Sequence, residues 1–125
     1  MKEPSADYRG FTFFFIYLTL AQLQFMIKTI CYVSDSKIKE SKVKLDKMFN
    51  DIKTKNIINN ISGVLIYKNG NFLQIIEGDK EIIDTLFLNI KKDKRHSHII
   101  TLIDFPIPHR LFKEYKTSFS IIDSP

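Results

Sequence analysis

Cysteine is almost absent from this 125-residue chain, and the only one, Cys31, excludes an internal disulfide and a zinc cluster built from thiolates. We therefore expect a reducing, cytoplasmic setting. The sequence also lacks a glycine-rich phosphate loop, a Ser-His-Asp arrangement and a pair of acidic residues suited to acid–base catalysis. His96-Ser97-His98 brings two imidazoles together without a third ligand, so we expect no metal site. These absences argue against an enzyme.

A long hydrophobic run is also missing. Residues 11–21, FTFFFIYLTLA, are apolar but cover roughly half of the ~20 residues that a transmembrane helix needs. Three interpretations stay open: a helix covering the domain, membrane association through residues 11–24, or an upstream extension that is not naturally translated, since Met26 starts the first convincing strand. We divide the chain into an N-terminal extension over 1–25, one domain over 26–122 and a tail over 123–125.

The excess of positive charge is modest and dispersed. Nineteen basic and 14 acidic residues give a net charge of +5, spread over lysine-rich stretches with helical patterns. A basic patch interleaved with aromatic residues, as nucleic-acid binding would need, is lacking. We therefore expect no nucleic-acid partner.

The strongest local signal is Asn69-Gly70 between two apolar runs, 63–67 and 72–76. It predicts a two-residue β-hairpin, because both central residues of a type I′ turn need positive φ. Alternation then places Leu65, Tyr67, Phe72, Gln74 and Ile76 on one side, and Val64, Ile66, Leu73 and Ile75 on the other. Both sides are largely apolar, so we expect the hairpin inside a sheet. An unpaired buried amide at Gln74 would cost about 1–3 kcal/mol, so Gln74 needs a partner.

The rest of the chain predicts alternating strands and helices. The expected elements are a strand over 25–34, a helix capped by Ser41, a polar connection over 54–60, a helix over 80–92 capped by Asp79, a strand over 97–105 ended by Pro106, and a strand over 117–122. With right-handed crossovers, the order βαββαββ puts both helices on one face of a five-stranded mixed sheet. This is an α+β, ferredoxin-like fold.

Several polar side chains could meet in a cleft between the two helices. Tyr32 and Gln74 can share the helix side of neighbouring strands, Asn56 follows the first helix, and Arg95 and His96 follow the second. With apolar walls, this mixture suits a planar heteroaromatic ligand. Simpler explanations stay open: a core tyrosine, a core glutamine bonded to backbone, a helix terminator and a solvated turn.

Taken together, these segments resemble the BLUF family, blue-light sensors that bind flavin. The resemblance covers about residues 26–122 and is carried by ICYVS around Tyr32, NIINNISGVLIY from Asn56, NGNFLQIIEG around Gln74, IKKDKRHSHI around Arg95, and PIPHRLF. It implies the same ferredoxin-like fold, with flavin held noncovalently between the two helices. FAD is the expected flavin, with FMN or riboflavin as alternatives.

The resemblance also implies a role for each matching residue. Tyr32 and Gln74 correspond to the photoactive tyrosine and glutamine. The implied cofactor-binding residues are Tyr32, Asn56, Leu65, Phe72, Gln74, Ile90, Asp93, Arg95 and His96. We therefore expect a blue-light photoreceptor in which electron and proton transfer from Tyr32 rearranges Gln74 and signals to an unidentified downstream protein.

Two features depart from the family's usual pattern. Tyr115 and Thr117 stand where a tryptophan and a methionine are usual, which leaves the direction and lifetime of the signalling state open. The second sheet face is also too apolar to stay in contact with water; it carries Cys31, Val33, Val64, Ile66, Leu73 and Ile75. Either residues 11–24 or another copy of the chain should cover it, and we expect a homo-oligomer.

Two other classes remain as alternatives. An acylphosphatase-like enzyme would need an arginine in a loop after the first strand, and residues 34–39 contain none. An RNA-binding module would need exposed aromatic residues on its central strands, at positions where the sequence does not supply them.

Overall fold

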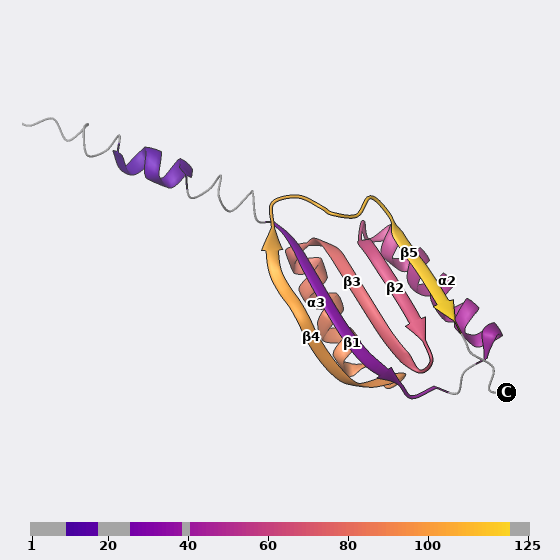
Figure 1. Ribbon diagram of the computed structural model, residues 1–125. Helices are drawn as coiled ribbons and strands as arrows, with labels where there is room; N and C mark the ends of the chain where they lie inside the picture. The colour runs from indigo at the N-terminus through magenta and orange to yellow at the C-terminus, as the bar shows by residue number, and fades with distance from the viewer. Residues whose placement is uncertain (1–9, 18–25, 39–40, 121–125) are drawn as a thin grey trace, which may run out of the picture.

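Five strands form one mixed sheet in the order β4-β1-β3-β2-β5, and two helices cover one of its faces (Figure 1). The computed structural model describes residues 10–17, 26–38 and 41–120. Its elements are β1 (Ile27–Ser36), α2 (Lys42–Ile58), β2 (Ser62–Lys68), β3 (Asn71–Asp79), α3 (Lys80–Lys92), β4 (His96–Ile107) and β5 (Tyr115–Ser120). The predicted α+β, ferredoxin-like fold is confirmed.

The hairpin has the predicted register. Leu65 pairs with Gln74 and Lys68 with Asn71, while Asn69 and Gly70 have φ values of 50° and 85°. β3 is the central strand, since it pairs with β2 on one side and with β1 on the other. The hairpin therefore lies inside the sheet, as its two apolar sides indicated.

Both helices begin where their capping residues predict. The Ser41 hydroxyl accepts a hydrogen bond from the Lys44 backbone N–H at 3.2 Å, and the Asp79 carboxylate accepts one from Glu81 N–H at 3.0 Å. α2 packs on β2 and β5, while α3 packs on β1 and β3. The core lies between these layers and includes Ile30, Leu45, Phe49, Tyr67, Ile76, Ile83 and Phe87.

α2 is longer than predicted, because the expected polar connection over 54–60 is mostly helix. The helix continues to Ile58, and Asn56 in its last turn is only 5% exposed. Backbone bonds from the Asn59 N–H to the Lys55 carbonyl and from the Ile61 N–H to the Asn56 carbonyl close this turn, and lysine is a good helix former. The helix stops at Asn59 and Asn60, and Asn60 takes the left-handed conformation with φ 55°.

Strand ends also differ from the sequence-based expectation. β4 runs through Pro106 to Ile107, so the prediction that Pro106 ends this strand was wrong. β4 is an edge strand, where a proline without an N–H is tolerated. β1 begins and ends two residues later than predicted, and β5 begins at Tyr115 rather than at residue 117. The predicted end of the last strand, residues 121–122, lies outside the described residues.

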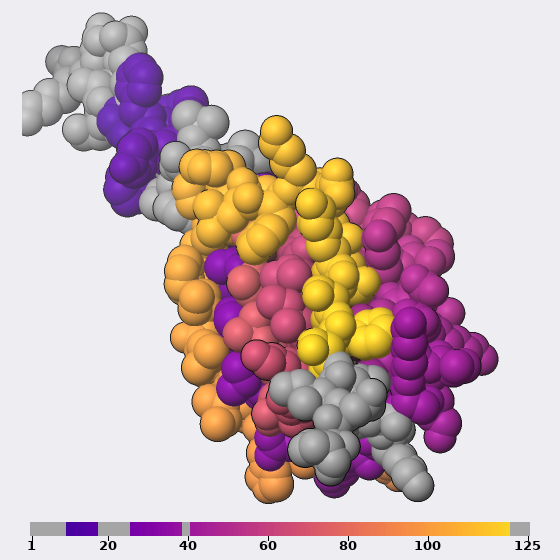
Figure 2. Space-filling model, turned by 45° about the vertical axis from the view of Figure 1, so that its right-hand side comes forward, coloured from indigo at the N-terminus to yellow at the C-terminus, as the bar shows by residue number. Residues whose placement is uncertain are grey.

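On the face opposite the helices, called the outer face below, the strands of the sheet reach the surface of the molecule (Figure 2). Ile66 and Phe105 on this face are 40% and 51% exposed. Residues 10–17 are helical and do not bury their apolar side chains, with Phe13 72% exposed; residues 18–24 of the proposed cover lie outside the described residues. None of the helices in the described part of the chain has the length and apolarity that crossing a membrane requires.

One end of the outer face is closed by a buried carboxylate. Glu77 on β3 has no exposed surface and accepts hydrogen bonds from the backbone N–H groups of Leu111 and Phe112 at 3.0 and 2.9 Å. Arg110 bonds the Ser62 hydroxyl and the Asn60 carbonyl beside it. These bonds connect the loop that precedes β5 to β2 and β3.

Candidate functional site

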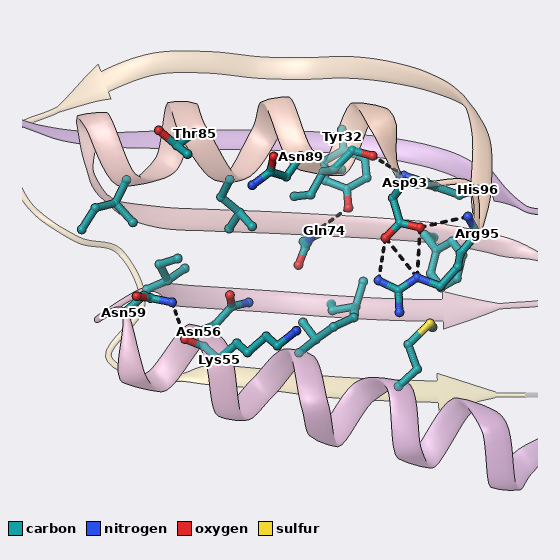
Figure 3. Close-up of a pocket in the computed structure, with 18 of the residues that line it drawn as sticks. Tyr32, Lys55, Asn56, Asn59, Gln74, Thr85, Asn89, Asp93, Arg95 and His96 are labelled. Atoms are coloured by element: carbon teal, nitrogen blue, oxygen red, sulfur yellow. Dashed lines mark hydrogen bonds and ion pairs between the residues drawn. The ribbon is translucent and has the colours of Figure 1, made fainter.

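A cavity of about 600 Å³ lies between α2 and α3, with the helix side of the sheet as its floor (Figure 3). Every residue predicted for the site lines this cavity: Tyr32, Asn56, Leu65, Phe72, Gln74, Ile90, Asp93, Arg95 and His96. The structure thus brings together residues that are widely separated in sequence. Their role in holding a ligand stays a prediction.

Tyr32 and Gln74 form the centre of the site. They are direct partners in the β1–β3 pairing, and both side chains point to the helix side. The Gln74 Nε2 group donates a hydrogen bond to the Tyr32 hydroxyl oxygen at 2.5 Å. The partner of the buried amide is therefore a phenol, and not the backbone. Burial raises the pKa of Tyr32, so its hydroxyl stays protonated at neutral pH.

A second phenol bonds the other end of the same amide. Tyr115, at the start of β5, donates its hydroxyl proton to the Gln74 Oε1 atom, and the Asn56 side chain lies beside the Tyr115 hydroxyl. Tyr115 is 2% exposed, and burial raises its pKa. Sequence reasoning placed this residue in the last strand region and missed its contact with Gln74.

Gly63 on β2 lies between the start of β5 and the central strand β3. Tyr115 is the register partner of Gly63 in the parallel β2–β5 pair, and Gly63 has no side chain on the helix side. Any side chain here would be strained, because Gly63 has φ 141° and an added Cβ would overlap the Ile75 carbonyl. A glycine is therefore required at this position of β2, between Tyr115 on β5 and the backbone of β3.

Asp93 and Arg95 form an ion pair at the rim. Arg95 Nε and Nη2 donate to the Asp93 carboxylate at 3.0 and 2.5 Å, and the Arg95 backbone N–H adds a bond of 2.9 Å. The hydrogen bonds from Arg95 hold the pKa of Asp93 below its usual value. The guanidinium side chain is 49% exposed, so it can also meet a negatively charged ligand from the solvent side.

His96 supports the wall through contacts with the protein itself. Its Nε2 atom lies 2.7 Å from the Ile90 carbonyl oxygen, and its Nδ1 atom lies 2.8 Å from the Ser34 hydroxyl. A carbonyl only accepts hydrogen bonds, so Nε2 carries a proton. The imidazole also stands edge-on to Tyr32 and Phe72. His96 therefore holds the end of α3 and two ring walls of the cavity in place.

Sequence reasoning missed several other lining residues. The polar ones are Lys55, Asn59, Glu81, Thr85 and Asn89, and the apolar ones are Met48, Ile52, Ile61, Ile82 and Leu86. Glu81, Thr85 and Asn89 recur every four residues on α3, a spacing that places them along one helix face. Ile82 is 42% exposed at the cavity wall.

The chemistry of the lining suits a flat ring with one polar edge. Leu65, Phe72 and Ile90 offer apolar contacts, whereas the amides of Gln74 and Asn56 offer donors and acceptors in the same cavity. The Gln74 Nε2 group has two N–H bonds, and the bond to Tyr32 uses one of them. Among the described residues, no cluster of His, Cys, Asp and Glu side chains could hold a metal ion. The lining therefore suits a planar heteroaromatic group.

Comparison with known proteins identifies the family. The profile of the BLUF family, described as sensors of blue light using FAD, matches residues 27–118. The chain belongs to this family, and the family's cofactor is FAD.

Relatives and solved structures agree with this family. The chain is 31% identical over 86 residues to photoactivated adenylate cyclase subunit beta of Euglena longa, an alignment that covers 69% of this chain and 10% of the relative. The structure of a bacterial light-regulated adenylyl cyclase has a TM-score of 0.70 at 33% identity, over 75% of this chain and 28% of that one. Klebsiella pneumoniae BlrP1, solved with FMN and cyclic diGMP, has a TM-score of 0.68 at 27% identity, over 75% and 26%. The chain thus spans about a tenth of the Euglena relative.

Proposed function

We propose that residues 26–122 form a light-sensing domain in which bound FAD, Tyr32 and Gln74 act as one switch. The observation that carries the proposal is the 2.5 Å hydrogen bond between Tyr32 and Gln74 on the cavity floor. A buried tyrosine, which can be oxidised, and a buried amide, which can reorient, lie in direct contact on adjacent strands. This is the arrangement that a flavin-based sensor needs.

The lining divides naturally into parts that would hold different portions of FAD. Asn56 and Gln74 would bond the polar edge of the ring, and Leu65, Phe72 and Ile90 would contact its faces. Arg95, oriented by Asp93, would approach the ring edge or the tail, and Lys55 on the opposite helix supplies a further cation. FMN or riboflavin would use the same ring contacts without the adenylate.

The chain's own residues account for the switch. When bound, the flavin absorbs blue light and becomes a strong oxidant. Tyr32 can give up an electron and the proton on Oη, and later take both back. The Gln74 amide can rotate or tautomerise during this exchange because both of its ends make hydrogen bonds. The lasting change is then in the hydrogen bonds that Gln74 offers, with no new covalent bond.

The output would pass to another protein. The Euglena relative is by its name a photoactivated adenylate cyclase subunit, and this chain matches about 10% of its length. The described part of this chain carries the candidate sensing site. We propose that the domain senses without catalysing a reaction, that it works in the cytoplasm, and that it signals to an unidentified downstream protein. The apolar outer face supports the expectation of a homo-oligomer.

The test is the absorption spectrum of the full chain with FAD. We expect a yellow protein whose flavin bands shift reversibly to longer wavelength under blue light. Gln74→Leu should keep the flavin but lose the shift. Asn71→Leu makes the same amide-to-leucine change in β3 outside the cavity and should leave the shift intact. A colourless protein that rebinds no FAD would contradict the proposed function, and a normal shift in Gln74→Leu would contradict the role of Gln74.

A further inference from the structure

We propose that Tyr115 is a positioning residue that bonds the Gln74 amide in both of its arrangements and so determines the lifetime of the light-induced state. The inference rests on the proposed function, and it assigns a task to a residue outside the predicted site. It follows from the direction of the hydrogen bonds around Gln74.

Three side chains form one continuous hydrogen-bonded chain, and a fourth lies beside it. The Tyr115 hydroxyl donates to Gln74 Oε1, and Gln74 Nε2 donates to Tyr32 Oη. The Asn56 side chain lies beside the Tyr115 hydroxyl. The four residues come from α2, β5, β3 and β1, and all are at most 5% exposed. Because water has little access to them, each donor and acceptor depends on its neighbour in the chain.

Rearrangement of Gln74 reverses what the amide presents to Tyr115. After rotation of the amide, the NH₂ group faces Tyr115 and the carbonyl faces Tyr32. In the imidic-acid form, where the proton has moved from Nε2 to Oε1, the new O–H also faces Tyr115. In both cases an acceptor has become a donor, so the side chain at position 115 must donate before the change and accept after it.

A phenol meets both requirements, whereas an indole N–H meets only the first. A hydroxyl group donates one hydrogen bond and accepts others, but the tryptophan N–H is a donor only. Tyr115 stands where the family usually has tryptophan, and it keeps a partner for Gln74 in either arrangement. We therefore expect the light-induced state of this chain to be stabilised at position 115.

Two substitutions separate the donor role from the acceptor role. In Tyr115→Trp the donor remains, so the dark absorption maximum should match the wild type, whereas dark recovery should be faster by about fivefold or more, the order expected for one unpaired buried donor. In Tyr115→Phe both roles are lost. Its dark spectrum should move part of the way toward the illuminated position, and its recovery should also accelerate.

Tyr67→Phe is the matched control, since it removes another buried hydroxyl from the helix side of the sheet. Tyr67 has no exposed surface and lies outside the cavity lining. Its removal should leave both the dark maximum and the recovery rate within about twofold of the wild type, because surrounding packing is kept.

A measurement in the dark tests the geometry without the photocycle. In full chain labelled with ¹⁵N-glutamine, the Gln74 side-chain NH₂ signals can be identified by their loss in Gln74→Leu. We expect one pair of signals in the wild type and in Tyr115→Trp, and a second pair or a clear shift in Tyr115→Phe. If Tyr115→Phe does not fold, the recovery rate of Tyr115→Trp decides.

The outcomes separate this inference from the proposed function. A chain that binds no flavin contradicts the proposed function itself. A chain with a normal photocycle, in which the Phe and Trp variants recover as slowly as the wild type, leaves the sensor in place and overturns the role of Tyr115.

Discussion

The helix side and the outer face of the sheet are built from alternate residues of the same strands, yet their side chains differ in polarity and in burial. On the helix side, Tyr32, Gln74 and Tyr115 are buried and bonded to one another. On the outer face, Ile66 and Phe105 present partly exposed apolar surface. The helix side is thus held by directional hydrogen bonds, whereas the outer face can make apolar contacts, which are not directional. Because side chains alternate along a strand, one set of strands carries the candidate site on one side and a partly exposed apolar surface on the other.

Adjacent residues of β2 offer the sharpest test of this difference. Leu65 is 3% exposed on the helix side, and its neighbour Ile66 is 40% exposed on the outer face. We expect Leu65→Ala to lower the free energy of unfolding by about 3 kcal/mol, because it opens a void beside the core. Ile66→Ala should cost less than about 1 kcal/mol in the same urea titration. Equal costs would mean that the outer face is buried in solution.

The buried end of the outer face should behave unlike the rest of it. Glu77→Ala removes the acceptor for the Leu111 and Phe112 backbone N–H groups, and we expect it to lower the free energy of unfolding by about 2–3 kcal/mol. Glu114→Ala, an exposed acidic residue of the same loop region, is the control and should change it by less than about 0.5 kcal/mol. Chemical denaturation of the two variants in parallel measures the difference. A mild effect at Glu77 would show that the loop finds other partners.

The smallest effect is expected at the rim of the helix side. The pKa of Asp93 is lowered by its bonds to Arg95, so the ion pair contributes stability above the unfolded pKa of about 4 and loses it as the pH falls through the folded value. Because both side chains are partly exposed, Asp93→Asn should cost less than about 1 kcal/mol at pH 7. The gap between the variant and the wild type should close below about pH 4. A gap that persists at lower pH would assign the effect to packing and not to charge.

Local patterns predicted much of the fold and the site. The Asn69-Gly70 turn fixed the hairpin register, and the alternation that followed placed Gln74 on the same side as Tyr32. These relations depend on residues close in sequence or on one crossover of known hand. They could therefore be worked out without coordinates.

The remaining features depend on contacts between distant segments. The bond from Tyr115 to Gln74 requires the parallel register of β2 with β5, which does not follow from residues near Tyr115. Likewise, the last turn of α2 packs Asn56 against the sheet, a long-range contact that the polar residues around Asn56 did not indicate. The run of β4 through Pro106 depends on its place at the edge of the sheet.

The length of α2 has a consequence for how this sequence can vary. Leu45 and Phe49 anchor the first half of the helix in the core, and Asn56 must then meet Tyr115 seven residues after Phe49. One residue inserted or deleted between Phe49 and Asn56 would turn the amide about 100° around the helix axis and shift it by about 1.5 Å along it. This stretch should therefore keep its length across natural variants even where its lysines are exchanged. Insertions and deletions should be accepted outside the helix, in the connection that precedes Ser41.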